Sequence, residues 1–362
     1  MPFAGDFGRE VLPYGVFSVD GGAPRIGVAV DDGVLDLAEA LGDDWVAPSL
    51  NAFMAQGRER WTYVRSLVKG FLDRPLIPAS DVTMHLPFEV ADYVDFYASE
   101  QHATNLGKMF RPDGDALLPN WKHLPVGYHG RAGTVVVSGT PVRRPSGLRA
   151  PGPTYGPCLK LDVEVEVGFV VGTPSALGKP VAAGDFEEHV FGIVLLNDWS
   201  ARDIQAYEYV PLGPFLGKSF ATSISPWVVP LEALDRVPSP VQDPVPDDYL
   251  QVAGDWAFDL ELTLEINGEV VSRPPFAGMY WTAPQMLAHL TANGASLRTG
   301  DLFASGTISG DDDPGSLIEL TWNGQNPVAG RTFLEDGDVA TITAVTASGR
   351  PLGAVTGRIV PA

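Results

Sequence analysis

The sequence predicts a mainly β protein of the α+β type, and three features lead to this class. The 362 residues include 40 glycines and 32 prolines, and this density of chain-breaking residues favours many short strands joined by turns over a helical bundle. Hydrophobic residues make up 45% of the chain, which is ordinary for a protein that buries a core. The apolar segments are short and recur along the chain. The length allows one large β-rich domain or two smaller ones.

The first part of the chain predicts a β-meander followed by a helix. Three candidate strands lie within residues 11–37, and they are separated by turns at 20–22 and 31–33 that contain Asp and Gly. Between about Leu50 and Leu72, apolar residues recur at helical spacing among Arg and Lys. Three prolines then crowd the interval 75–87, so we expect a domain boundary there.

The rest of the chain is rich in predicted strands. They are expected at residues 134–139, 161–171, 189–196, 258–267, 317–322 and 338–345. One helix is expected at Pro284–Asn293, because Gly294 supplies the left-handed residue that commonly ends a helix. The proline-rich stretch 238–248 predicts a surface loop or linker.

Charge, hydropathy and cysteine content exclude several classes of protein. Lys and Arg number 24 against 45 Asp and Glu, a net charge of −21, so the chain lacks the basic surface that nucleic acids and anionic membranes require. The central apolar run Val190–Leu196 is far shorter than a membrane span. The amino terminus has no secretory signal pattern, and the single Cys158 excludes an internal disulfide and multi-thiolate metal sites. We expect a soluble, cytoplasmic protein.

Three acidic residues alternate with apolar ones in the predicted strand 161–167. Because side chains alternate between the two faces of a strand, Asp162, Glu164 and Glu166 should share one face. Residues two apart lie about 7 Å from each other, close enough for two carboxylates to reach one hard cation. The alternative is a half-buried strand with a solvated acidic face. The apolar run 168–171 that follows favours burial on both faces, where like charges need a positive partner.

Asp198 lies where a predicted buried strand ends. The chain then enters a predicted helix that contains Arg202, Gln205 and Tyr209. A carboxylate at this position is either a ligand to a bound group or, like Ser200, a cap for the following helix. This segment alone leaves both interpretations open.

The segment 92–102 brings Asp95, Tyr97 and His102 into one short stretch. If residues 98–107 are helical, His102 begins the second turn of that helix. A lone histidine is more often a hydrogen-bonded structural residue than a catalytic base, so this segment also needs support from elsewhere.

Several blocks of the sequence resemble the fumarylacetoacetate hydrolase family. They are DFYASEQHATNLGKMFR (95–111), LLPNWKHLPVGYHGRAGTVVVSGTPVRRP (117–145), NDWSARDIQAYEYVPLGPFLGKSFATSISPWVVP (197–230), MYWTAPQML (279–287) and GDLFASGTISG (300–310). The resemblance extends over essentially the whole chain. It implies a small N-terminal SH3-like β-barrel over residues 1–87, a larger C-terminal catalytic mixed β-roll over 88–362, and a homodimer.

The resemblance also implies a role for each matching residue. The carboxylates that hold a divalent cation match Asp95, Glu164, Glu166 and Asp198. The general base matches His102, and the carboxylate that orients it matches Glu319. Groups that stabilise developing negative charge match Arg202, Gln205 and Lys218. Substrate contacts match Tyr97, Arg111, Tyr128, Gln205, Tyr209 and Thr307. A second, structural cation would lie near Lys218 and Thr222. Asp162 matches no family role and is interpreted as structural.

The reaction that the resemblance implies is hydrolysis of the carbon–carbon bond of 4-fumarylacetoacetate. The products are fumarate and acetoacetate, and the step is the last one in tyrosine and phenylalanine catabolism. A histidine is suited to activate the attacking water, and a hard cation is suited to stabilise the departing enolate. Oxygen-only ligands favour Ca²⁺, Mg²⁺ or Mn²⁺ over Zn²⁺.

The proposed substrate is an anionic diketo acid, whereas the protein itself is strongly acidic. Arg111, Arg202 and Lys218 would therefore reverse the charge locally inside the site. Two alternatives remain. One is an acylpyruvate hydrolase or oxaloacetate decarboxylase of the same superfamily, and the other is a non-catalytic binding protein in which the cation only stabilises the fold.

Overall fold

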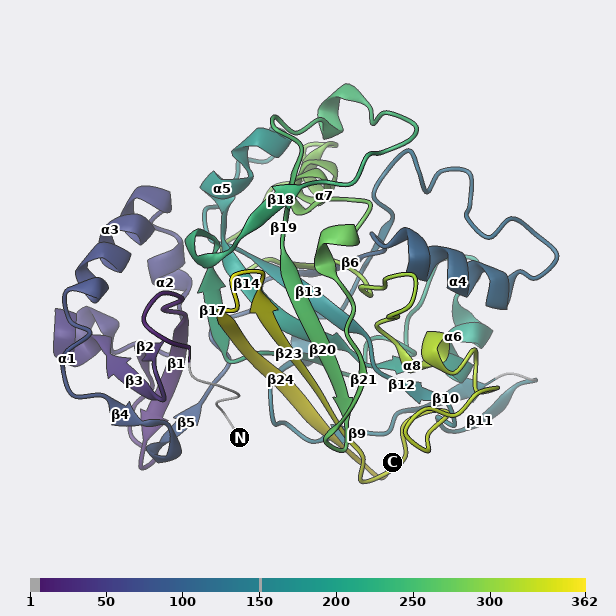
Figure 1. Ribbon diagram of the computed structural model, residues 1–362, viewed down its shortest axis with the longest axis horizontal. Coiled ribbons are helices and arrows are strands. Elements are labelled where there is room, and N and C mark those ends of the chain that lie inside the picture. The colour runs from purple at the N-terminus through teal and green to yellow at the C-terminus, as the bar shows by residue number, and fades with distance from the viewer. Residues whose placement is uncertain (1–6, 150–151) are drawn as a thin grey trace.

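A computed structural model describes residues 7–149 and 152–362 of the chain. Strands account for 32% of the residues and helices for 22%, so the predicted mainly β class is confirmed. Most strands belong to two sheets, one of 13 strands and one of five (Figure 1).

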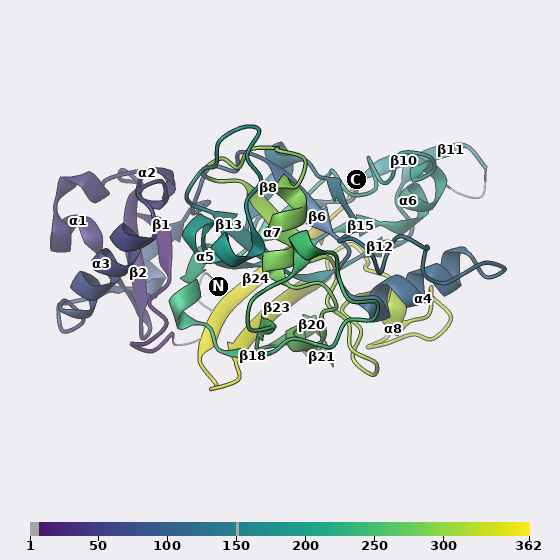
Figure 2. The ribbon, with the colours of Figure 1, turned by 90° about the horizontal axis from the view of Figure 1, so that it is seen from above.

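The first strands form the predicted meander. These strands are β1 (Tyr14–Val19), β2 (Arg25–Val30) and β3 (Gly33–Asp36), with β4 (Ile77–Pro78) beside β3 and β5 (Val82–Met84) beside β1. The accompanying helices are α1 (Leu37–Leu41), α2 (Asn51–Met54) and α3 (Arg58–Lys69). The prediction of one helix over 50–72 is corrected to two, because Gly57 adopts a φ of +85° between α2 and α3. These elements lie at one end of the molecule (Figures 1 and 2).

The large sheet continues past residue 87 without a break. Strand β1 pairs with β17 (Trp227–Pro230), and Tyr14 lies opposite Val228. From β17 the sheet runs through β14 (Val190–Asp198), β13 (Val165–Val171), β22 (Leu302–Ala304), β6 (Tyr93–Phe96) and β7 (Gly127–His129). Strand β16 (Thr222–Ile224) pairs with both β14 and β8 (Val135–Val137). Every residue of β13 and β14 is buried, which confirms the double-faced burial expected of this region.

The second sheet packs against the first in the larger part of the molecule. It contains β21 (Glu269–Ser272), β20 (Leu260–Ile266), β23 (Val339–Thr346), β24 (Pro351–Val360) and β9 (Val142–Arg143). Apolar residues of β20 and β23 share one buried cluster with those of β13 and β14. Three strand pairs stand apart: β10 (Ser146–Arg149) with β11 (Thr154–Pro157), β12 (Leu161–Asp162) with β15 (Ser200–Ala201), and β18 (Arg236–Pro238) with β19 (Trp256–Phe258).

The helices of the larger part are α4 (Glu100–Phe110), α5 (Phe186–His189), α6 (Arg202–Glu208), α7 (Ala283–Thr291) and α8 (Leu317–Leu320). Helix α7 confirms the prediction of a helix near 284–293, and Gly294 follows it with a φ of +88°. Helices α4, α6 and α8 lie together at the end of the molecule opposite β1–β3 (Figures 1 and 2).

The strand predicted at 317–322 is wrong, because this segment begins with helix α8. The backbone N–H groups of Leu317 and Ile318 donate to the carboxylate of Asp162, at 2.8 and 3.2 Å. A carboxylate that accepts from the first N–H groups of a helix satisfies donors that have no partner inside the helix. The alternating apolar pattern is therefore overridden by a contact with a residue 155 positions earlier in the sequence.

The continuous strand predicted at 161–171 is also corrected. It is interrupted after Asp162, and regular pairing resumes at Val165. The backbone N–H of Glu164 donates to the side-chain oxygen of Asn197 rather than to a strand carbonyl. This interruption changes the direction of the carboxylates at 162, 164 and 166, for which the alternation predicts a single face.

Three further expectations concern loops and termini. Residues 239–247 form a largely exposed loop, as the prolines predict. Within residues 7–149 and 152–362, no helix has the length and apolar character needed to cross a membrane. Residues 1–6, which open both the proposed N-terminal domain and the segment searched for a signal, lie outside the described residues.

Candidate active site

Four buried carboxylates meet on three strands of the large sheet, β14, its neighbour β13, and β6, which is separated from β13 by β22. Asp95 lies on β6, Glu166 on β13 and Asp198 at the end of β14, while Glu164 directly precedes β13. One carboxylate oxygen from each residue lies within 4.8 Å of the others. The structure therefore brings together the four acidic residues that the sequence predicted as one site.

The chemistry of this cluster fits a hard divalent cation. Both carboxylate oxygens of Glu166 and Oδ1 of Asp95 are buried and make no hydrogen bond within the described residues. Burial and the neighbouring carboxylates raise the pKa of Glu166 and of Asp95 well above the ordinary range. Buried carboxylates without donors are costly, whereas an oxygen-binding cation would satisfy all of them at once.

Two basic side chains lie against the cluster. Lys218 donates from Nζ to Glu164 and to Oδ2 of Asp198, the latter at 2.6 Å. Arg202 donates from Nη2 to Oε1 of Glu164 at 2.7 Å. Burial alone would raise the pKa of Glu164, but Lys218 and Arg202 outweigh it and lower the pKa. Glu164 is thus held ionised, although two cationic groups do not balance four carboxylates.

Asp162 does not join the cluster. Its carboxylate instead accepts from Nε of Arg202 at 2.8 Å and from the first N–H groups of α8. Neither Asp198 nor Ser200 caps α6, because the N-cap residue of that helix is Ala201, and Ser200 donates to the carbonyl oxygen of Asp198. The carboxylate of Asp198 accepts hydrogen bonds from Lys218, Tyr128 and Thr222. The side chains of Lys218 and Thr222 both donate to Asp198, and a second cation near them stays a prediction.

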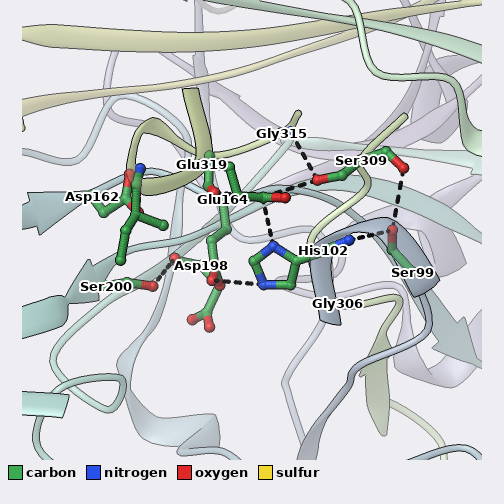
Figure 3. A network of polar contacts seen from close by, with 12 residues as sticks. Ser99, His102, Asp162, Glu164, Asp198, Ser200, Gly306, Ser309, Gly315 and Glu319 are labelled. Atoms are coloured by element: carbon green, nitrogen blue, oxygen red, sulfur yellow. Dashed lines mark hydrogen bonds and ion pairs between the residues drawn. The ribbon is translucent and has the colours of Figure 1, made fainter. Parts of the chain in front are cut away.

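His102 lies beside the cluster on helix α4 (Figure 3). It is the third residue of the helix and so belongs to the first turn, not the second. Ser99 caps this turn by accepting from the backbone N–H of His102 at 3.2 Å. The imidazole Nδ1 lies 2.6 Å from Oε2 of Glu319, and Nε2 lies 3.9 Å from Oε1 of Glu164. Because a carboxylate only accepts, Nδ1 carries a proton that it donates to Glu319, and Nε2 is the ring nitrogen on the side of Glu164.

Glu319 accepts hydrogen bonds from four side chains. Besides His102, it accepts from Ser316 at 2.7 Å, from Ser309 at 3.0 Å and from Asn105 at 3.0 Å. Burial would raise the pKa of Glu319, but His102 and these hydrogen bonds lower it, so the carboxylate stays ionised. Sequence reasoning missed these three donors, because their contact with Glu319 depends on the unpredicted helix α8 that carries it.

The cluster and His102 face the same cavity, which has a volume of about 360 Å³. Of the residues predicted to act in the site, Asp198, Glu319 and Thr222 lie behind its wall. All six predicted substrate contacts line it, namely Tyr97, Arg111, Tyr128, Gln205, Tyr209 and Thr307. Arg111 donates to backbone carbonyl oxygens in the segment that follows α4, and Gln205 accepts from Arg202.

Apolar side chains form much of the remaining wall, and sequence reasoning did not name them. They include Phe96, Leu106, Phe110, Leu118, Val126 and Leu212. A signal for two of them was present, because Leu106 and Phe110 follow His102 at intervals of four residues and so share its helix face. Leu118 and Leu212 lie on loops, where no periodicity identifies them.

Comparisons with known proteins agree over nearly the whole chain. The family model described as fumarylacetoacetate (FAA) hydrolase C-terminal matches residues 92–360, and the one described as fumarylacetoacetase N-terminal matches residues 10–87. The chain is 48% identical to the fumarylacetoacetase of Homo sapiens, over 93% of this chain and 91% of that protein. It is 43% identical to the fumarylacetoacetase of Arabidopsis thaliana, over 98% and 96% of the two chains.

Solved structures share the fold at lower identity. A fumarylacetoacetate hydrolase from psychrophilic Exiguobacterium antarcticum superposes with a TM-score of 0.60 at 19% identity, over 97% of this chain and 100% of that one. A maleylpyruvate hydrolase from Sphingobium sp., in complex with manganese(II) ion and pyruvate, superposes with a TM-score of 0.57 at 17% identity, over 97% and 99%. With both family models matched in order, the chain belongs to the fumarylacetoacetate hydrolase family and is an enzyme of the hydrolase class.

Proposed function

We propose that this enzyme hydrolyses the carbon–carbon bond of 4-fumarylacetoacetate to give fumarate and acetoacetate, the last step of tyrosine and phenylalanine catabolism. The observation that carries the proposal is the buried His102–Glu319 pair, whose histidine lies beside the four-carboxylate cluster in the wall of one cavity. Relatives from animals and plants that are 42–48% identical carry the name fumarylacetoacetase. A protein that only bound a cation would have no use for a base with its own orienting acid.

His102 acts as the general base in this proposal. Nδ1–H donates to Glu319, which fixes the ring and the tautomer and stabilises the imidazolium once it forms. Nε2 then takes the proton from a water molecule in the cavity, and that water attacks the carbonyl carbon. The T-shaped contact between the rings of Tyr97 and His102, with centroids 5.3 Å apart, limits rotation of the imidazole.

Arg202, Gln205 and Lys218 supply positive charge and hydrogen-bond donors where the negative charge develops. Burial alone would lower the pKa of Lys218 and of Arg202, but the adjacent carboxylates raise both pKa values, so both side chains stay cationic. Removing one such donor typically costs roughly 100- to 1,000-fold in rate. Gln205 accepts from Arg202 through its oxygen, so its NH₂ group is available for other partners.

Asp95, Glu164, Glu166 and Asp198 are the residues that would hold the cation. A divalent cation bound there supplies Lewis-acid stabilisation to the oxygens of a β-diketone. The all-oxygen ligand set supports Ca²⁺, Mg²⁺ or Mn²⁺ as its identity. All four carboxylates are buried, and three of them, Asp95, Glu164 and Glu166, line the cavity.

The substrate, an anionic diketo acid, would be gripped at its charged end by Arg111. In the free protein its guanidinium donates to the carbonyl oxygens of Asp115 and Ala116, which are weaker partners than a carboxylate. The rest of the substrate would be contacted by Tyr97, Tyr128, Tyr209 and Thr307. Thr307 supports this role, because its buried hydroxyl has no hydrogen-bond partner within the described residues.

The larger organisation belongs to the same proposal. A division into an N-terminal SH3-like domain (1–87) and a catalytic domain (88–362) is supported by family models that match 10–87 and 92–360 separately. A cytoplasmic homodimer is expected from the family. Exposed apolar side chains near the cavity, Val210, Leu212 and Phe215, are consistent with a surface that a second copy covers. Light scattering of the purified protein tests the dimer.

The test of the proposed reaction is a direct assay with purified protein and Mg²⁺ or Ca²⁺. The ultraviolet absorbance of 4-fumarylacetoacetate should fall, and fumarate and acetoacetate should appear in equal amounts. Acylpyruvates and oxaloacetate, assayed in parallel, should turn over much more slowly. A preference for either of them over 4-fumarylacetoacetate would assign the chain to another activity of the family.

A further inference from the structure

Asp162 is a fully buried carboxylate that the proposed reaction does not use. It lies at the end of β12, two residues before the cluster residue Glu164. Its carboxylate contacts two separate parts of the site: Oδ2 accepts from Arg202 on α6, and both oxygens accept from backbone N–H groups of α8. Figure 3 shows it beside the cluster, close to Ser200.

The first contact holds the guanidinium of Arg202. Oδ2 of Asp162 accepts from Nε at 2.8 Å, while Nη2 donates to Glu164 at 2.7 Å and Nη1 to Gln205 at 3.1 Å. Each edge of the planar group thus has its own acceptor. Because a guanidinium presents its donors in a fixed plane, removing the acceptor at Nε leaves that plane free to tilt about the remaining contacts.

The second contact fixes where α8 begins. Oδ1 of Asp162 accepts from the N–H of Leu317 at 2.8 Å, and Oδ2 accepts from the N–H of Ile318 at 3.2 Å. The helix extends only over Leu317–Leu320, so it is too short to be stable on its own. Glu319 is the next residue after these two donors, and it carries the 2.6 Å contact to His102.

We propose that Asp162 is a positioning residue, whose one carboxylate sets both the guanidinium of Arg202 and the helix that presents Glu319 to His102. It touches neither substrate nor base and acts through these two neighbours. The proposal rests on the proposed function of His102 and Arg202. It explains why an acidic residue is buried at this position, where a purely apolar strand residue would cost less to bury.

A matched control is available in the N-terminal part of the chain. Asp36 is also buried, caps the short helix α1 by accepting from the N–H of Ala38 at 2.9 Å, and forms an ion pair with Arg25 at 2.6 Å. Asp36→Asn and Asp162→Asn therefore remove the same chemical features, a buried charge that caps a short helix and pairs with an arginine. Only the second lies next to the proposed active site.

The first experiment compares kcat and KM of the two variants at saturating Mg²⁺. Both should lower the melting temperature. Asp162→Asn alone should lower kcat, by about 100-fold, as expected when a reacting group is misplaced by about 1 Å. KM should change little, because the side chains proposed to contact the substrate are unaltered. Equal kcat values for the two variants and the wild-type protein would overturn the proposal.

A second readout needs no turnover. The Nδ1 proton that His102 donates to Glu319 over 2.6 Å should give a far-downfield ¹H resonance, which His102→Gln would identify by its absence. This resonance should shift or broaden in Asp162→Asn and remain in place in Asp36→Asn; an unchanged resonance in Asp162→Asn would overturn the role through α8. If the wild-type enzyme failed to hydrolyse 4-fumarylacetoacetate, the proposed function would fall, and this measurement would still decide the positioning role.

A double-mutant comparison tests whether Asp162 acts on kcat through Glu319. In a Glu319→Gln background, Asp162→Asn should cost much less in kcat than it does in the wild-type protein, because its effect through Glu319 is already lost. Fully additive losses would contradict the proposal. Should Asp162→Asn fail to fold, Asp162→Glu replaces it, since it keeps the charge but displaces the carboxylate. The same losses of kcat and of the resonance are then expected, and wild-type values of both would overturn the proposal.

Discussion

Nδ1 of His102 lies 2.6 Å from Oε2 of Glu319, although the two residues are 217 positions apart in the sequence. The first comes from helix α4 and the second from α8, and both side chains are almost completely buried. Such a pair holds one imidazole tautomer and leaves the other ring nitrogen toward the cavity. The chemistry of the site depends on this long-range contact.

Replacing His102 by alanine should abolish turnover while leaving cation binding intact. His102 contributes no oxygen ligand to the cluster, and a positioned general base typically accelerates a reaction by roughly 100- to 10,000-fold. Steady-state rates and the cation content by elemental analysis provide the two measurements. Undiminished turnover would remove His102 from the role of base, and loss of the cation would show that it also supports the cluster.

Removal of the cation should destabilise the protein, and Glu166→Gln should reverse part of that effect. Glu166 has two buried oxygens without a donor, so neutralising it relieves a cost of about 1–3 kcal/mol in the cation-free protein. Scanning calorimetry in EDTA should therefore show a higher melting temperature for Glu166→Gln than for the wild type. With added cation the order should invert, because saturation at 100 times Kd stabilises the wild type by about 2.7 kcal/mol. The same order in both conditions would refute the ligand assignment.

The cation-free protein should become less stable as the pH rises above the ordinary carboxyl pKa of about 4. The pKa values of Asp95 and Glu166 are raised in the folded state, so the folded protein holds protons that the unfolded chain has released. Stability is therefore greatest below the unfolded pKa and is lost as the pH rises through the raised folded pKa. Melting temperatures in EDTA should fall toward neutral pH, and the gain on adding Mg²⁺ should increase. A cation-free melting temperature that rises over this interval would contradict the assignment.

Salt should leave substrate capture unchanged or improve it slightly. The protein carries a net charge of −21 and the proposed substrate is an anion, so the long-range field is repulsive and salt screens it. The buried partners Arg202 and Lys218 are screened much less. Measuring kcat/KM against NaCl concentration tests this balance, and a steep decline would indicate that exposed basic residues attract the substrate instead.

The sequence predicts the cluster well because its residues lie on or beside regular strands. Alternation along β13 and the polar end of β14 indicate where Glu166 and Asp198 lie, and the family resemblance adds their roles. Helix α8 could not be predicted in the same way. The segment that contains Glu319 alternates apolar and polar residues as a strand does, and its helical state depends on Asp162, which is far away in the sequence. Ser309, Ser316 and Asn105 escape prediction for the same reason.

Single residues that end or begin helices also limit what apolar spacing in the sequence can predict. Gly57 divides α2 from α3 within a pattern that indicates one helix, and apolar spacing alone does not report the break. A helix that starts at residue 98 predicts His102 in the second turn, but α4 starts two residues later, at Glu100. The serine at position 99 is the available signal, since it caps the helix and fixes the turn to which His102 belongs.

The pairing of β1 with β17 has a consequence for how this chain can be divided. The family models end and begin near residue 90, yet the hydrogen-bonded sheet crosses that point. If residues 88–362 were produced alone, β17 would become an edge strand, and its fully buried Val228 would lose the apolar N-terminal residues, such as Tyr14 and Val16, with which it is clustered. An exposed apolar edge is a template for aggregation. The N-terminal part thus protects the edge of the sheet permanently. Truncation at the family boundary is therefore a poor route to a smaller soluble enzyme.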